Sequence, residues 1–149
     1  NIALQNELKN EESVAIHIRK GDGYATWPQF VGTCPKDYYQ KAINICLEKF
    51  DKPKFYVFTD VPSLVSNYLS GIEYKLVDWN PTVGYGNHFD MQLMSSAKHN
   101  IIANSTYSWW GAWLNDNPEK IVIAPQEWFK LTSQIKQQPN LYPSEWILI

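Results

Sequence analysis

The sequence has few cysteines, no excess of basic charge and no long apolar run. Cys34 and Cys46 are too few for a disulfide framework and lack the spacing of a metal site. The formal net charge of -2 provides no basic surface for a nucleic-acid backbone. No apolar stretch approaches the ~18 residues of a membrane span. We therefore expect a cytoplasmic protein with no transmembrane segment and no nucleic-acid partner.

Two nucleotide-binding signatures are also missing. Neither GxGxxG nor GxxxxGK[ST] occurs, so a bound nucleotide would have to be held by another route. No signal peptide is present, and we expect a chain that begins with Asn1 rather than Met to be either a cut piece or a processed product.

Aromatic side chains, in contrast, are abundant. Seven Trp, nine Tyr and six Phe make up 15% of the chain, and such planar surfaces bind sugars or bases as well as filling cores. With 149 residues, 44% of them hydrophobic and 19% charged, the composition is typical of one globular domain.

Apolar periodicity predicts strands that alternate with helices. The expected strands are residues 13–19, 54–60, 73–79, 100–105 and 120–125, and the expected helices are residues 34–50, 61–70, 88–99 and 106–116. Residues 146–149 are either an edge strand or a simple end. This alternation predicts an α/β, Rossmann-like three-layer sandwich around a parallel sheet.

Polar residues follow most of the expected strands. They are residues 17–22, Thr59, Asp60, Asp78 and residues 104–108. Ligands of parallel α/β sheets bind at the carboxyl ends of the strands. We therefore expect these side chains to converge on one cleft.

The first of these clusters is "HIRKGDG", residues 17–23. Arg19 at a strand end can grip a phosphate through two charge-assisted hydrogen bonds, and such a contact strengthens as a leaving diphosphate gains charge. The alternative is an ion pair from Arg19 to Asp22 that locks a turn. His17 shares a strand face with Arg19, which a turn lock does not explain, whereas Lys20 points to the opposite face.

The second cluster lies in "NSTYSWWGAW", at an expected strand-to-helix junction. Its small polar residues are Asn104, Ser105, Thr106 and Ser108. One or two of them would suffice to cap a helix. Four exceed that need, and hydroxyls at a helix N-terminus provide a phosphate site. Trp109 and Trp113 share one helix face, and we expect them in the core.

Two carboxylates have open roles. Asp60 is either a general base or a helix cap before Pro62, and the cap is favoured. Asp90 either accepts hydrogen bonds from a base or ribose or is an ordinary first-turn helix carboxylate. A metal-dependent hydrolase would be built on His17, Asp22, His88 and Asp90. No HxH or HExxH spacing supports that reading, so we expect no metal.

Three segments together resemble a known family. "VAIHIRKGDG" (residues 14–23) resembles the HxRxGD motif of the α-1,2-fucosyltransferases, glycosyltransferase family 11. "HFDMQLMSSAKHNIIANSTYSWWGAWLN" (residues 88–115) resembles the second long motif of that family. "FYVFTDVPSLV" (residues 55–65) is similar to a third, looser one.

The resemblance implies that this chain is the donor-binding half of a GT-B-like glycosyltransferase. The implied donor is GDP-fucose, used without metal or cofactor. The implied acceptor is a galactose hydroxyl of an oligosaccharide or glycolipid, fucosylated in α-1,2 linkage with inversion. The family also implies a preceding acceptor-side half, absent from this chain, and a location in the bacterial cytoplasm, either free or peripheral at the inner membrane.

By position, the resemblance also assigns roles to residues. Arg19 would hold the β-phosphate, Asp22 would orient the arginine loop, and His17 and Asp90 would contact the guanosine. We assign His17, Arg19 and Asp22 to catalysis. The expected donor-binding set is Asp60, Asp90, Asn104, Ser105, Thr106, Tyr107, Ser108 and Trp109. The alternative is a non-catalytic module that binds a nucleotide or a glycan.

Overall fold

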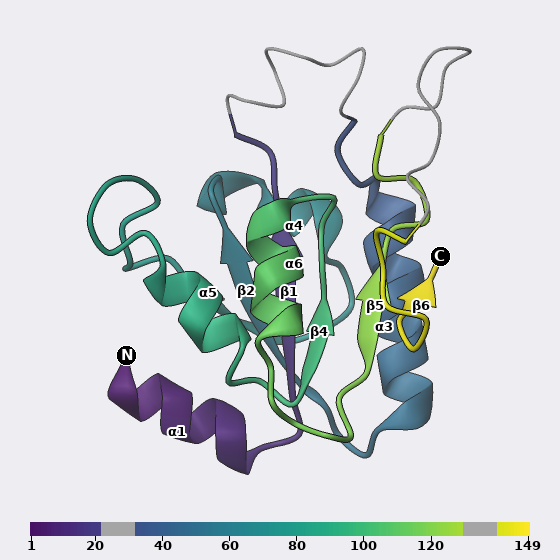
Figure 1. The fold of residues 1–149 in the computed structure, drawn as a ribbon, viewed down its shortest axis with the longest axis horizontal. Coiled ribbons are helices and arrows are strands. Elements are labelled where there is room, and N and C mark those ends of the chain that lie inside the picture. The colour runs from purple at the N-terminus through teal and green to yellow at the C-terminus, as the bar shows by residue number, and fades with distance from the viewer. Residues whose placement is uncertain (22–31, 130–139) are drawn as a thin grey trace.

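The computed structural model describes residues 1–21, 32–129 and 140–149, which form a parallel sheet with helices on both faces (Figure 1). The strands are β1 (Ser13–Ile18), β2 (Lys54–Thr59), β3 (Tyr74–Val77), β4 (His99–Ile101), β5 (Val122–Ala124) and β6 (Ile147–Leu148). Their order is β3-β2-β1-β4-β5-β6, and each neighbouring pair is parallel. The predicted Rossmann-like α/β fold is confirmed.

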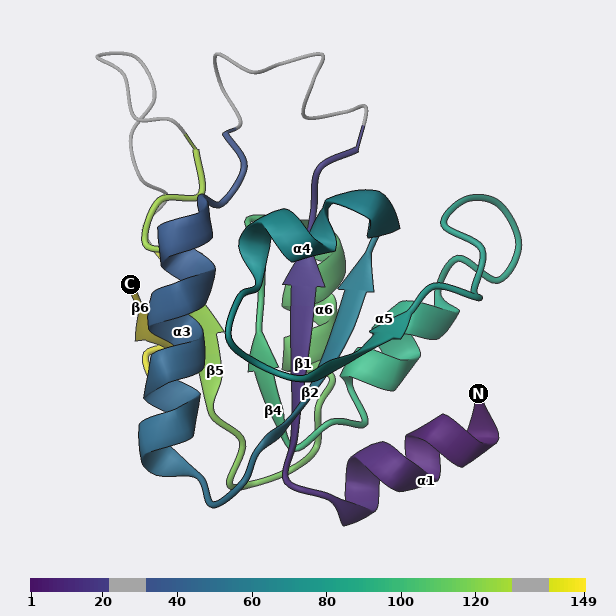
Figure 2. The same ribbon diagram turned by 180° about the vertical axis from the view of Figure 1, so that it is seen from behind.

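The helices cover the two faces of the sheet in separate groups. They are α1 (Ile2–Asn10), α3 (Lys36–Lys49), the 3-10 turn η1 (Pro62–Leu64), α4 (Val65–Tyr68), α5 (Phe89–Met94) and α6 (Thr106–Trp113). Helices α1, α5 and α6 lie on the face turned to the viewer in Figure 1, and α3 and α4 lie on the face seen in Figure 2. None of the helices in the described part of the chain has the length and apolar character needed to cross a membrane.

Strand β1 lies at the centre of the sheet, and all six of its residues are buried. Val14, Ile16 and Ile18 belong to the core cluster that includes residues of α3 and α4, whereas Ala15 belongs to the cluster beneath α1 and α5. The alternation of side chains between the two faces of the sheet continues past the end of β1. The ammonium group of Lys20 lies 4.5 Å from the centre of the Tyr68 ring of α4, so Lys20 points away from the face of His17, as predicted.

All four expected helices are shorter than their patterns indicate, and the difference is largest at residues 61–70 and 88–99. Residues 61–70 form only η1 and the four residues of α4. The helix expected at 88–99 ends at Met94, because the Ser95 and Ser96 hydroxyls donate to the Gln92 carbonyl and compete with the helical pattern. The Asn100 side chain then donates to the Met94 carbonyl at 2.8 Å, which satisfies the end of α5.

Helix α1 was not predicted. Leu4 and Leu8 bury its inner face, and its acidic residues anchor it to the sheet. The Tyr56 hydroxyl donates to Glu11 at 2.6 Å, and Lys75 pairs with Glu7 at 2.7 Å. These partners lie far along the chain, so the local sequence gives only a weak signal for this helix.

Of the two α6 tryptophans that were expected in the core, Trp109 and Trp113, only the first packs against it. The rings of Trp109 and Trp113 stack with centroids 5.3 Å apart, as their spacing requires. Trp109 packs against the small core cluster that contains Trp146. The prediction that Trp113 is core is wrong, because half of its surface is exposed.

His99 ties together three neighbouring strands at the edge opposite their carboxyl ends. Its Nδ1 accepts from the Ile121 backbone N–H at 3.0 Å, so Nε2 carries the proton and donates to Glu12 at 2.7 Å. The imidazole also stacks on Phe50, with centroids 3.9 Å apart. Burial lowers the pKa of His99, and the Glu12 carboxylate opposes this shift.

Replacing His99 with Leu should therefore destabilise the fold by about 2–4 kcal/mol, because the buried Ile121 N–H loses its acceptor and Glu12 loses its donor. Urea denaturation measures the loss. The matched control is Lys98→Ala, which removes a part-exposed ion pair to the same Glu12 and should cost less than about 1 kcal/mol. Equal losses for the two variants would contradict the account.

Candidate functional site

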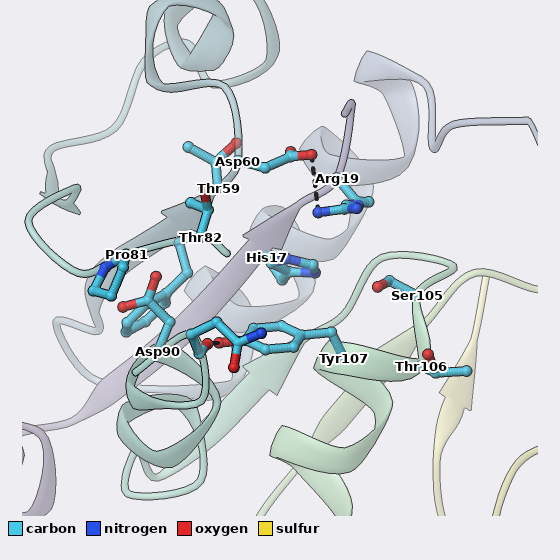
Figure 3. A pocket seen from close by; sticks show the side chains of 12 residues that line it. His17, Arg19, Thr59, Asp60, Pro81, Thr82, Asp90, Ser105, Thr106 and Tyr107 are labelled. Carbon is cyan, nitrogen blue, oxygen red and sulfur yellow. Dashed lines mark hydrogen bonds and ion pairs between the residues drawn. The ribbon is translucent and has the colours of Figure 1, made fainter. Parts of the chain in front are cut away.

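The polar residues behind the strands meet in a cleft of about 330 Å³ at the carboxyl edge of the sheet (Figure 3). It is lined by His17, Arg19, Phe58, Thr59, Asp60, Pro81, Thr82, Asn87, Asp90, Ser105, Thr106 and Tyr107. The predicted convergence is thus confirmed for most of the named strand ends. Asp78 does not line this cleft, whereas Pro81 and Thr82, a few residues further on, do.

The parallel register of β1 and β2 brings Arg19 beside Asp60. Ile18 pairs with Thr59 at the last position of the ladder, so Arg19 and Asp60 both follow directly. Arg19 Nη1 lies 3.0 Å from Asp60 Oδ2, and the Asp60 side chain is only 10% exposed. Asp22, the partner that the turn-lock alternative requires, lies outside the described residues.

The expectation that Asp60 caps the following helix is wrong. The first turn of η1 has no side-chain cap, and the Thr59 hydroxyl accepts from the Val61 N–H instead, at 3.1 Å. The Asp60 carboxylate is turned toward β1, where Oδ1 accepts from the Lys20 N–H at 2.9 Å and Oδ2 pairs with Arg19. The charged guanidinium of Arg19 and the Lys20 N–H bind the carboxylate more strongly than a helix N-terminus would, so Asp60 does not cap η1.

His17 lies at the floor of the cleft and is 4% exposed. Its ring packs against that of Tyr107, with centroids 5.7 Å apart, and its Nδ1 has no hydrogen-bond partner among the residues that the structure describes. Burial lowers the pKa of His17 to about 4, Asp60 opposes this and Arg19 adds to it. The imidazole is therefore neutral at neutral pH and offers a ligand a hydrogen bond rather than a charge.

The N-terminus of α6 forms another wall of the cleft. Ser105 is its N-cap residue, yet its side chain makes no capping hydrogen bond, so the hydroxyl is not committed to the helix. Ser105 and Thr106 both line the cleft. The first N–H groups of a helix have no partners within it and carry the positive end of its dipole. This wall therefore suits an anion, and Arg19 lines the same cleft.

Three predicted donor-binding residues lie outside the cleft lining. The buried Ser108 hydroxyl donates to the Ser105 carbonyl at 3.2 Å, within the helix. Trp109 donates from Nε1 to the Leu141 carbonyl, and Asn104 donates to the Trp128 carbonyl and lines a different cavity. A direct contact of these three with a donor stays a prediction.

Tyr107 joins α6 to the segment that precedes and begins α5. Its hydroxyl accepts from the Met91 N–H at 2.9 Å and donates to the Asn87 carbonyl. Burial raises the pKa of the phenol to about 12. The hydroxyl thus holds the cleft wall at Asn87, while the ring packs on His17.

Asp90 lies in the first turn of α5, beside Pro81 and Thr82 in Figure 3. It is 8% exposed and accepts from the Asn80 amide at 2.7 Å. Burial raises the pKa of Asp90, and the Asn80 hydrogen bond opposes the shift. The loop "NPTVGYGN" (residues 80–87) holds three lining residues that the sequence reasoning missed, although it directly follows an expected strand.

The hypothesis of a metal site finds no geometric support in the described parts of the chain, which hold no group of three or more His, Cys, Asp or Glu arranged around a common point. The His88 ring packs on Phe89 instead. Cys34 and Cys46 are buried, and burial raises the pKa of Cys34 to about 11 and that of Cys46 to about 12. Neither thiol has the character of a nucleophile.

A parallel sheet with an anion-suited cleft at its carboxyl edge is the arrangement with which α/β domains bind nucleotides. The family model "Glycosyl transferase family 11" matches residues 1–149. The chain therefore belongs to glycosyltransferase family 11, and the resemblance inferred from the motifs is confirmed.

Two relatives from Escherichia coli are similar to this chain. The O-antigen biosynthesis glycosyltransferase WbnK is 43% identical over 124 residues, which are 81% of this chain and 40% of the relative. An alpha-1,2-colitosyltransferase is 35% identical over 148 residues, which are 98% of this chain and 50% of the relative. The chain thus spans about half the length of the curated relatives that it matches.

The buried neutral His17 predicts a loss of stability in acid. The unfolded chain takes up a proton on His17 below its ordinary pKa of 6.5, whereas the folded protein does so only near 4. The stabilisation is therefore complete above 6.5 and is lost as the pH falls toward 4. Between pH 7.5 and 4.5, His17→Gln should lose about 2–3 kcal/mol less unfolding free energy than the wild type.

Urea denaturation at the two pH values measures this difference. The control is His88→Gln, which changes an exposed histidine and should keep the wild-type loss. If His17→Gln loses as much stability in acid as the wild type, His17 is not held neutral in the folded protein.

Proposed function

We propose that this chain is the donor-binding half of an α-1,2-fucosyltransferase that uses GDP-fucose. The enzyme would transfer L-fucose to a galactose hydroxyl of an oligosaccharide or glycolipid. The observation that carries the proposal is the shared cleft of Arg19 and the uncapped start of α6, which together supply positive charge for a diphosphate. The name of the colitosyltransferase relative supports α-1,2 transfer of a deoxyhexose.

The reaction that suits this cleft is displacement at the anomeric carbon of the sugar. The acceptor hydroxyl oxygen forms a bond to C1 from the face opposite the diphosphate, the bond from C1 to the phosphate oxygen breaks, and the hydroxyl proton leaves to a base. Negative charge grows on the β-phosphate as GDP leaves. Arg19 and the α6 N–H groups would stabilise that charge, and no metal is expected in this role.

The opposite end of the cleft suits a guanine. A carboxylate such as Asp90 can accept from both N1–H and the exocyclic amine of guanine, whereas adenine and uracil do not present that pair of donors. The buried Nδ1 of His17, which has no hydrogen-bond partner among residues 1–21, 32–129 and 140–149, would meet the nucleoside. The acceptor would be held by the other half of the enzyme, and a cytoplasmic location, free or peripheral at the inner membrane, stays part of the proposal.

Calorimetry with GDP, ADP and UDP tests the donor. GDP should bind more tightly than the other two. Arg19→Ala should weaken GDP binding by about 10- to 100-fold, because a charge-assisted contact is lost. The matched control is Lys20→Ala, which removes the neighbouring positive charge that points to Tyr68 and should leave GDP binding unchanged. Equal affinity for the three nucleotides, or equal effects of the two variants, would contradict the proposal.

The substitution Asp90→Asn tests whether Asp90 contacts the guanine. An amide offers one acceptor oxygen in place of two, so GDP and guanosine should each bind about tenfold more weakly, while inorganic diphosphate should bind as it does to the wild type. A loss for inorganic diphosphate as large as that for GDP would place Asp90 at the phosphates instead.

Transfer from GDP-fucose by the full-length protein separates an enzyme from a binding module. The proposal expects release of GDP that depends on a galactose-containing acceptor. Binding of GDP or free oligosaccharide with no GDP release would favour the non-catalytic module. GDP-colitose serves as a second donor, and a clear preference for it would overturn the choice of fucose while leaving the family assignment intact.

A further inference from the structure

The two oxygens of the Asp60 carboxylate have different contacts in the described part of the chain: Oδ1 accepts a hydrogen bond, whereas the buried Oδ2 makes an ion pair but no hydrogen bond. Oδ1 accepts from the Lys20 backbone N–H, which belongs to the chain leaving β1, and Oδ2 lies 3.0 Å from Arg19 Nη1. A carboxylate engaged in this way is poorly placed to abstract a proton from an acceptor. The arrangement therefore disfavours the general-base role and joins Asp60 to Arg19.

Gly21 provides the space that this arrangement needs. A Cβ at position 21 would overlap Asp60 Oδ2 and would lie 3.6 Å from Arg19 Cζ. Any larger residue would have to displace the carboxylate that holds Arg19. The glycine of the "RKGD" stretch is thus explained by close approach to Asp60 rather than by the backbone freedom of a turn.

An arginine at a strand end needs such support. Its long side chain has several rotatable bonds. If a ligand has to order this side chain on binding, the loss of conformational entropy lowers the affinity. The Asp60 side chain is 10% exposed and the Arg19 side chain is 34% exposed, so water screens the ion pair only from the side of Arg19. The ion pair through Nη1 restricts the positions that the guanidinium group can take.

We propose that Asp60 is a positioning residue that aims Arg19 at the phosphates of the donor, with Gly21 keeping the space for its carboxylate. The inference rests on the proposed function, because it assumes a nucleoside diphosphate in the cleft. Asp60 need not touch the donor. Its effect passes through Arg19 and should be confined to the part of the ligand that Arg19 contacts.

The test compares GDP, GMP and guanosine as ligands of the wild type and of Asp60→Asn. Asparagine keeps the shape and an oxygen for the Lys20 N–H but removes the charge that holds Arg19. The variant should lose about tenfold of the preference for GDP over GMP and bind guanosine as the wild type does. In an Arg19→Ala background, Asp60→Asn should have no further effect on GDP binding.

Two further variants test whether the effect depends on the position of the Asp60 carboxylate. Gly21→Ala should reproduce the loss of GDP-over-GMP preference, because its methyl group displaces the same carboxylate. Glu7→Gln is the matched control, since it also removes a carboxylate from an ion pair, with Lys75 on β3, but lies outside the cleft. It should leave all three affinities unchanged.

A merely structural role for Asp60 predicts a different pattern. Equal weakening of GDP, GMP and guanosine by Asp60→Asn, or an undiminished effect in the Arg19→Ala background, would overturn the inference. Wild-type protein that prefers ADP or UDP would overturn the proposed donor alone, because the same comparison is then made with that nucleotide and its monophosphate. Wild-type protein that binds no nucleoside diphosphate would overturn both.

Discussion

The parallel pairing of β1 with β2 is the constraint on which the cleft depends. Because the ladder ends at Ile18 and Thr59, the next residue of each strand emerges at the same height, and these residues are Arg19 and Asp60. The buried apolar side chains of both strands determine this register, since a slip by one residue would turn them to the wrong faces. The hydrophobic pattern of the core thus places a positive charge beside its carboxylate at the edge of the sheet.

Positive potential and the Asp90 carboxylate lie at different ends of the cleft (Figure 3). Arg19 and the start of α6 provide positive potential, and Asp60 balances Arg19 in the absence of a ligand. Burial keeps His17 neutral, so it does not add a third positive charge. Asp90 lies among Asn80, Pro81 and Thr82, where a base with N–H donors would suit it. The proposed binding of a nucleoside diphosphate in one direction requires this polarity.

The sequence predicted those parts of the molecule that rest on local patterns. The apolar runs at 13–19 and 54–60 predicted the central strands, and the HxRxGD-like stretch together with the motif at residues 88–115 indicated the family. It could not predict features that depend on distant partners. Helix α1 is anchored by Tyr56 and Lys75, and the Asp60 carboxylate pairs with Arg19 instead of capping the helix that follows it. Each of these outcomes is decided by a contact that only the folded chain brings together.

We propose that Arg19 and the N-terminus of α6 bind the diphosphate of a guanosine diphosphate sugar. A crystal structure of the protein with GDP tests it most directly. The β-phosphate should lie within hydrogen-bond distance of the Arg19 guanidinium and of the first N–H groups of α6, with the guanine toward Asp90. GDP bound in the reverse direction, or in the cavity lined by Asn104 and Trp128, would contradict it.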